Sequence, residues 1–156
     1  MNIIQTVFAG LMLAGLFQCL SADGAQSLPV RTLAKGAFSG IRNAREEIVT
    51  SAEEWEKLWK QHATSGGAAE KVPAVDFTRE MVIIATMGAK PTGGYAIEIV
   101  SADVHGRNLR ISVRRTSPPP GAITIQAFTA PFHFAAVPRR KLKPEFTDAA
   151  DGAKEK

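Results

Sequence analysis

Three histidines are the residues of this chain best suited to acid–base or metal chemistry, but their spacing forms no catalytic motif. His62, His105 and His133 lie far apart in the sequence, so only the fold could bring them together as a metal site or a serine–histidine pair. The chain contains neither His-Glu-x-x-His nor Gly-x-Ser-x-Gly. We therefore expect no enzyme activity, no catalytic residue, no bound metal and no cofactor.

The segment from Gly88 to Tyr95 has the two-glycine spacing of a phosphate-binding loop. Gly94 and Tyr95, however, occupy the positions where Lys and Ser or Thr would contact phosphate and magnesium, and the sequence that follows is strand-like rather than helical. Two interpretations stay open. The glycines either allow positive φ in an ordinary turn, or they and Pro91 hold Thr92 and Tyr95 at a binding edge with little ordering cost.

The N-terminal 22 residues contain no Asp, Glu, Lys or Arg, and Val7 to Leu20 is an apolar run. This pattern predicts a secretory signal peptide over residues 1–25 and an exported, periplasmic or extracellular, product. The run approaches membrane-spanning length, so an uncleaved anchor is the alternative. Cys19 is the only cysteine; the bulky residues before it fit a lipidation site poorly, and its removal would leave a core without disulfides.

Overall composition predicts one globular domain, with 45% hydrophobic and 22% charged residues and a net charge of +4. The charge is uneven, because residues 1–102 carry net −1 and residues 103–156 carry net +5. The excess includes Arg110, Arg114 and the run from Arg139 to Lys143. A solvated basic sheet face explains it; an acidic partner or peripheral contact with an anionic membrane is the alternative. Nucleic acid is not expected, because aromatic residues do not alternate with the basic ones.

One helix is predicted from a capping box at Ser51 and Glu54. Trp55, Leu58, Trp59 and His62 follow at the spacing of a single apolar stripe. We expect the tryptophans to be core anchors, His62 to be structural, and the helix to end at 65–67.

The remaining elements are predicted to be strands. They cover 37–41, Met81 to Thr86, a hairpin of Tyr95–Val104 with Leu109–Arg115, 123–128 and Phe132–Val137. In the hairpin, Val104 should oppose Leu109, Ala102 should oppose Ile111, Val100 should oppose Val113 and Asp103 should oppose Arg110, around a four-residue turn. The prolines at 118–120 must interrupt the sheet.

Several of these motifs together resemble the PrcB C-terminal domain family. They are Met87-Gly88, Lys90 to Tyr95, Ser117 to Gly121, Gln126 to His133 and Val137-Pro138, and the tryptophan helix fits the same pattern, so the resemblance runs from Phe38 to Phe146. The family takes its name from a subunit of a secreted bacterial protease complex. The resemblance thus implies an exported accessory or stabilising subunit without catalytic residues.

Pro91 to Tyr95 is also similar to one loop of the chagasin-type cysteine-protease inhibitors, which wedge three loops into a protease cleft. By that analogy the other loops would be 117–121 and 130–133, although position 90 is Lys, Gly93 replaces a threonine and the arginine of the inhibitors' later motif is missing. Protease inhibition is the alternative function.

The sequence therefore predicts a single α+β domain, mainly antiparallel β-sheet with one amphipathic helix packed on it. Its organisation is a signal peptide (1–25), a linker (26–36), the domain (37–147) and a polar tail (148–156). We expect a protein partner, which could be a protease; the oligomeric state is left open. The candidate partner-binding residues are Lys90, Pro91, Thr92, Gly93, Gly94, Tyr95, Pro118, Gly121, Pro131, Phe132 and His133.

Overall fold

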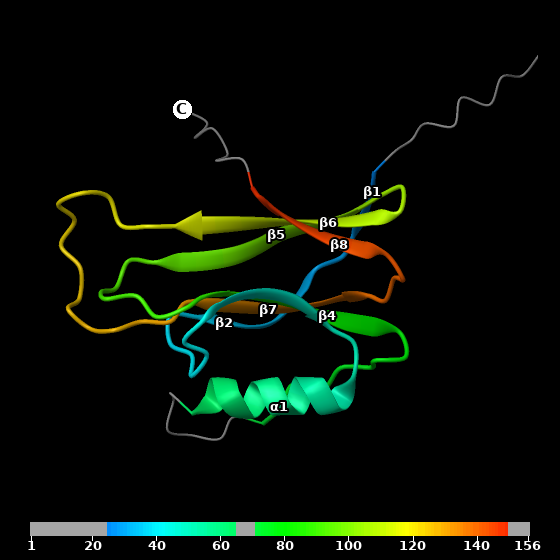
Figure 1. The fold of residues 1–156 in the computed structure, drawn as a ribbon, viewed down its shortest axis with the longest axis horizontal. Helices are drawn as coiled ribbons and strands as arrows, with labels where there is room; N and C mark the ends of the chain where they lie inside the picture. The colour runs from blue at the N-terminus through cyan, green and yellow to red at the C-terminus, as the bar shows by residue number, and fades with distance from the viewer. Residues whose placement is uncertain (1–24, 65–70, 150–156) are drawn as a thin grey trace, which may run out of the picture.

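The fold comprises two stacked β-sheets with one helix packed on the outer face of the second sheet (Figure 1). It was obtained as a computed structural model, which describes residues 25–64 and 71–149. The predicted signal peptide therefore lies outside the described residues apart from Ala25, as does most of the predicted polar tail. The structure is α+β and dominated by sheet, as the sequence predicted.

The first sheet has the strand order β1-β5-β6-β8, and the second has the order β2-β7-β4-β3. All neighbouring strands are antiparallel except β6 and β8, which are parallel. The elements are β1 (Gln26–Leu28), β2 (Arg31–Gly36), β3 (Ala44–Val49), α1 (Ala52–Ala63), β4 (Glu80–Met87), β5 (Ala96–His105), β6 (Asn108–Thr116), β7 (Phe132–Pro138) and β8 (Lys143–Asp148).

Strand β4 explains how the layers form two cores. Met81, Ile83 and Ala85 pack in the core between the sheets, whereas Val82 and Ile84 pack in the core beneath α1. Alternate residues of a strand point to opposite faces, so a strand covered on both faces is a continuous apolar run rather than an alternating one. β7 is buried in the same way, and the predicted strands Met81 to Thr86 and Phe132–Val137 are both present.

The predicted helix is confirmed. Ser51 is its N-cap and accepts a hydrogen bond from the Glu54 amide at 3.3 Å. The predicted stripe of Trp55, Leu58, Trp59 and His62 is buried against the second sheet. The predicted stop at 65–67 lies outside the described residues; the last helical residue is Ala63 and the C-cap is Thr64.

The hairpin of β5 and β6 is confirmed with one correction to its register. Three of the predicted pairs are present, namely Val104 with Leu109, Ala102 with Ile111 and Asp103 with Arg110. Val113, however, pairs with Ile99 instead of Val100, because the register shifts between Ile99 and Ser101. The turn is also tighter than predicted: His105 pairs with Asn108, which leaves Gly106 and Arg107, and Gly106 has φ of +57°.

Three predictions about the other segments are wrong. The expected linker 26–36 is the strands β1 and β2, which are held by backbone pairing to β5 and β7. The expected strand 37–41 is irregular, because this segment instead closes on the helix end through a hydrogen bond from the Gly40 amide to the His62 carbonyl. The expected strand 123–128 is loop, and its apolar residues are exposed without a partner strand.

The domain also extends further than predicted. β8, which was not predicted, runs to Asp148 and pairs with β6. The helix of the described residues is too short and too polar to cross a membrane.

Candidate docking surface

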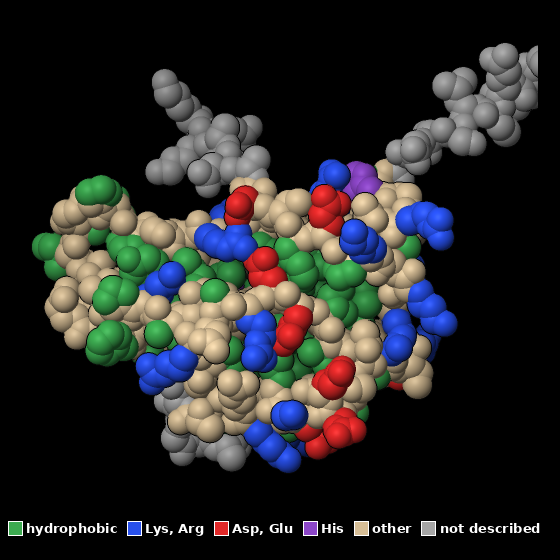
Figure 2. Space-filling view, viewed as in Figure 1, with side chains coloured by type: hydrophobic (Ala, Val, Ile, Leu, Met, Phe, Trp, Pro, Cys, Tyr) green, Lys and Arg blue, Asp and Glu red, His purple; other side chains and the backbone are tan. Residues whose placement is uncertain are grey.

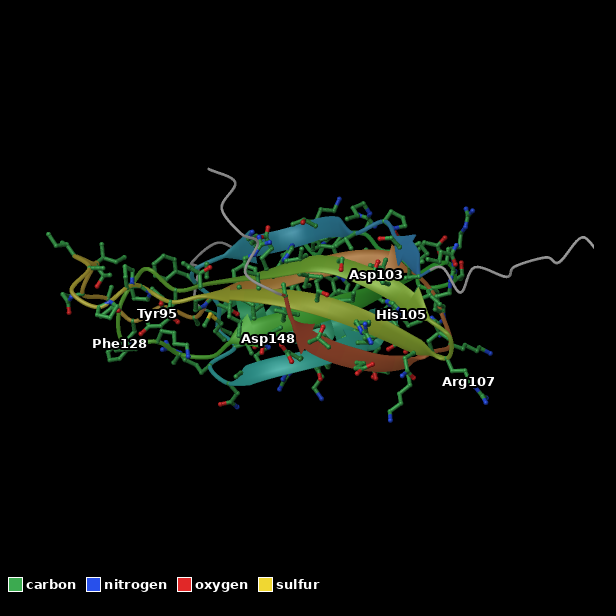
Figure 3. All side chains as sticks on the ribbon, turned by 90° about the horizontal axis from the view of Figure 1, so that it is seen from above. Tyr95, Asp103, His105, Arg107, Phe128 and Asp148 are labelled. Carbon is green, nitrogen blue, oxygen red and sulfur yellow. The ribbon has the colours of Figure 1, made fainter. Side chains whose placement is uncertain are left out.

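Three connections meet at one end of the two sheets. They are residues 37–43 between β2 and β3, 88–95 between β4 and β5, and 117–131 between β6 and β7. We call these three segments together the loop end. Figure 3 shows Tyr95 and Phe128 at this end, with Arg107 of the β5–β6 turn at the opposite end.

Backbone hydrogen bonds join the three segments to one another. The amide of Lys90 donates to the carbonyl of Thr129 at 2.7 Å, and the Thr129 amide returns a bond to the Lys90 carbonyl at 2.9 Å. The Thr129 hydroxyl also donates to the carbonyl of Thr92 at 2.8 Å. The Ala130 amide donates to the carbonyl of Ala37 at 2.8 Å. The three segments of the loop end therefore hold one another in place, and a surface fixed in this way loses little conformational entropy when it binds.

The two adjacent glycines permit this close packing. A Cβ on Gly93 would lie 2.5 Å from Cγ1 of Ile125, and the Gly93 amide donates to the Ile125 carbonyl at 3.0 Å. Gly94 has φ of +87°, and a Cβ there would lie 3.0 Å from Cβ of Pro118. The interpretation as a turn with positive φ is confirmed at Gly94. The loop is also fixed against 117–131, and its role as a binding edge stays a prediction.

The loop end exposes four large apolar side chains, all of them in segments that were predicted to be strands, 37–41 and 123–128. Ile123 is 104% exposed, Phe128 73%, Ile125 61% and Phe38 55%. Figure 2 shows the hydrophobic side chains gathered at this end of the molecule. Large apolar groups that are gathered on one surface mark an interaction site more often than single exposed ones do. The alternation Ile123, Ile125 was the available signal, and it could not distinguish a strand from an exposed loop.

The charge of the loop end is sparse and of one sign. Its three segments contain only two ionisable charges, Arg42 and Lys90, and no Asp or Glu. Lys90 Nζ lies 5.5 Å from the centre of the Tyr95 ring, within range of a cation–π interaction.

The structure separates the predicted binding residues into two groups. Pro91, Gly94 and Gly121 are exposed at the loop end, and Gly93 is buried there. The remaining four at this end are half-buried, namely Lys90, Thr92, Tyr95 and Pro118.

The prediction that Pro131, Phe132 and His133 form a presented loop is wrong. All three residues are buried, and the last two belong to β7 in the middle of the second sheet. β7 pairs with β2 on one side and with β4 on the other, and both of its faces pack in a core. Its side chains are therefore buried.

His133 has a structural role between the two sheets. Its Nδ1 accepts a hydrogen bond from the Ile99 amide at 2.8 Å, and its Nε2 lies 2.9 Å from the Thr32 hydroxyl. The ring is therefore neutral and carries its proton on Nε2. Burial, and next the charge of Lys35, lower the pKa of His133 from 6.5 to about 4, although Glu98 opposes the shift.

His62 is held by a different set of contacts. Its Nδ1 lies 2.9 Å from Oγ of Ser39, which also accepts from the Ile41 amide at 3.1 Å. The Ser39 side chain is buried and serves to fix the segment 37–41 to the helix, while His62 also lines the groove described below. His105 lies in the first sheet beside the β5–β6 turn, and the fold thus keeps the three histidines apart. The described ranges contain no group of three or more residues that could hold a metal ion.

A groove of about 450 Å³ runs between β2 and the C-terminal end of α1. Its apolar lining comes from both elements and from the neighbouring segments, and includes Leu33, Phe38, Trp59 and Phe132. Phe38 also lines a small separate recess together with Phe128, so the groove adjoins the loop end at Phe38.

Comparison with known proteins gives one match. No curated protein and no solved structure matches the chain. The family model described as PrcB C-terminal matches residues 81–138. The match spans nearly all of β4, all of β5, β6 and β7, and the two loops between them that lie at the loop end; α1 lies outside it. Residues 81–138 are therefore similar to the PrcB C-terminal family, the family that the spaced motifs of the sequence predicted.

Proposed function

We propose that this chain is an exported, non-catalytic accessory domain that binds a partner protein of an extracytoplasmic protease or envelope complex through its loop end. The match of residues 81–138 to the PrcB C-terminal family model supports the link to a protease complex. The uncharged N-terminal segment supports export. The absence of any catalytic motif in the sequence supports a binding role.

One observation carries the proposed surface. Ile123, Ile125 and Phe128 are exposed on the loop 117–131. The backbone of this loop is hydrogen-bonded to the other two segments of the loop end. Exposed apolar side chains on a fixed scaffold can be buried by a partner without a large ordering cost. A few such residues supply most of the binding free energy in a typical interface.

The alternative function, protease inhibition by three inserted loops, is not supported for one of the three loops. Its third loop was expected at 130–133, and these residues are buried at the start of β7. A buried strand cannot enter a protease cleft, so we do not extend the inhibitor hypothesis to this chain.

The test is capture of the partner from the native host with matched surface variants. The full chain carries a C-terminal affinity handle, the envelope fraction is cross-linked, and bound proteins are identified and quantified by mass spectrometry. The test variant is I123S/F128S. The control is V100S, which removes an apolar side chain that is 40% exposed on the first sheet, away from the loop end.

We expect one reproducible stoichiometric partner with the wild type and with V100S. Capture by I123S/F128S should fall about tenfold or more, since central apolar anchors of an interface typically contribute 2 kcal/mol or more. Equal capture by I123S/F128S and the wild type would contradict the proposed surface. A captured enzyme that is equally stable in cells with and without this chain would contradict the stabilising role.

A further inference from the structure

The end of the molecule opposite the loop end is basic. Arg107 lies in the β5–β6 turn, and Arg140, Lys141 and Lys143 lie on the connection from β7 into β8. All four side chains are exposed, and the Lys143 amide donates to the Arg107 carbonyl at 3.2 Å, which brings the two segments together. We call these four residues the basic end. Figure 2 shows Lys and Arg side chains gathered on this side.

The cations of the basic end have no carboxylate partner within residues 25–64 and 71–149. Elsewhere the described basic residues are often paired: Arg31 with Glu80 at 2.8 Å, Lys35 with Glu98 at 2.7 Å, and Arg115 with Glu46 and Asp148. The acids nearest in the strands are engaged or set back. Glu80 is held by Arg31, Asp103 accepts from the Ser101 hydroxyl, and Glu145 lies further along β8 in register with Arg110. The basic end thus keeps its positive potential.

The chain enters the domain at this same end. β1 begins at Gln26, which pairs with Val104 next to the β5–β6 turn. The apolar run ends at Leu20, and only residues 21–25 separate it from β1. Five residues span at most about 18 Å even when fully extended. Whenever the apolar run lies in a bilayer, during export or as an anchor, the basic end is therefore held close to the lipid headgroups.

We infer that the basic end is a docking surface for an anionic lipid bilayer. This inference uses residues other than those of the loop end; it rests on the proposed function only for export and not for the partner-binding surface. Arg and Lys side chains near a membrane surface are attracted to anionic headgroups within a Debye length. β5 has 10 residues, so the loop end lies roughly 30 Å away and faces away from the membrane in this orientation.

An acidic protein is the competing occupant, and the position of the N-terminal segment favours the lipid. Lipid headgroups surround the point where the chain leaves the membrane, whereas nothing in the structure places a protein partner there. The loop end is the less suitable end for lipid, because Arg42 and Lys90 are its only charges.

Flotation of the full chain with vesicles tests the inference. The vesicles consist of phosphatidylcholine with or without phosphatidylglycerol, and the readout is the ratio of the partition coefficients for the two compositions. Residues 1–22 carry no charged side chain, and this segment with its α-amino group is the same in every variant, so differences in the ratio between variants report on the substituted residues. The test variant is K141E/K143E; the matched control is K57E/K60E, which makes the same charge change on two exposed lysines of α1.

We expect the wild type and K57E/K60E to prefer phosphatidylglycerol vesicles at low salt and to lose that preference at high salt. The ratio should fall about 25-fold in K141E/K143E, at about fivefold for each cation removed. Circular dichroism and thermal melting check that both variants are folded.

Three results would overturn the inference. The first is an equal partition of the wild type into both kinds of vesicle, and the second is an equal loss in the two double variants, which would reflect net charge alone. The third is binding to soluble polyglutamate without any preference for phosphatidylglycerol, which would assign the basic end to an acidic protein.

Discussion

His133 connects the two sheets through Nδ1, which bonds to β5, whereas its Nε2 contacts Thr32 of β2 in its own sheet. Nδ1 of His133 accepts a hydrogen bond from the Ile99 amide, which lies where the register between β5 and β6 shifts. On the other edge of β5, β1 pairs only with residues 102–104 and does not reach Ile99. The imidazole therefore satisfies a buried donor that strand pairing leaves without a partner. Sequence reasoning placed this residue in a binding loop, because neither the β5 irregularity nor the burial of β7 on both faces can be read from local pattern.

The low pKa of His133 makes the stability of the fold sensitive to acid. The pKa is about 4 in the folded chain and about 6.5 when unfolded, so the unfolded chain binds more protons as the pH falls through this interval. The stabilisation is complete above pH 6.5 and is lost between pH 6.5 and pH 4. The contribution of His133 should be about 2 kcal/mol smaller at pH 5 than at pH 7.5.

Urea unfolding of the wild type and H133F at the two pH values checks this expectation. H133F should be less stable at pH 7.5 by about 1–3 kcal/mol, because the Ile99 amide loses its acceptor, and it should lose less stability on acidification than the wild type. A variant with the same acid dependence as the wild type would place the titration elsewhere.

Gly94 and Gly121 offer a comparison of backbone strain with crowding. Both have positive φ, but a Cβ on Gly94 would approach Pro118 to 3.0 Å whereas nothing lies within 4 Å of one on Gly121. Each glycine-to-alanine change should cost about 1–2 kcal/mol from the positive φ. Gly94→Ala should cost roughly 1 kcal/mol more from overpacking. Equal losses in urea unfolding would mean that loops 88–95 and 117–131 are not tightly packed in solution.

At the scale of elements, α1 contributes its stability through its tryptophans. Trp55 is 2% exposed, its Nε1 donates to the Pro73 carbonyl at 3.0 Å, and its ring packs edge-on against Phe134 at 5.8 Å. Trp55→Ala should reduce the free energy of unfolding by about 3–5 kcal/mol. Lys60→Ala, on the exposed face of the same helix, should change it by less than about 0.5 kcal/mol in the same denaturation experiment.

The elements that the sequence predicted are those whose signal is local. α1 has both a cap and a stripe, β4 and β7 are apolar runs, and β5 and β6 alternate buried residues with exposed or half-buried ones around a turn. All four strands occupy the interior of the sheets. β1, β2, β3 and β8 were missed or misassigned, and all of them except β1 carry at least two charged residues. These are the outermost strands of the two sheets. An edge strand forms by pairing with a neighbour that is distant in sequence, which a local pattern does not report.

The whole molecule has two ends for which binding is proposed, and only part of each could be predicted from the sequence. The glycine and proline loop was recognised from residue types, but its exposed partners at 123–128 were assigned to a strand because alternating apolar residues normally bury one face. The excess of positive charge was recognised from counting. Its concentration beside Gln26 depends on β1 pairing with the end of β5, which no composition can reveal.

The separation of the two ends predicts that they act independently. Sites roughly 30 Å apart without shared contacts contribute additively to binding free energy. Once the partner is identified, the wild type should bring it to phosphatidylglycerol vesicles in a flotation assay. K141E/K143E should bind the partner in solution with unchanged affinity but lose the preference of the complex for anionic vesicles. I123S/F128S should keep that lipid preference and leave the partner unbound. Loss of partner affinity in K141E/K143E would mean that the basic end belongs to the protein interface, so the domain would be enclosed by its partner rather than held between a membrane and a complex.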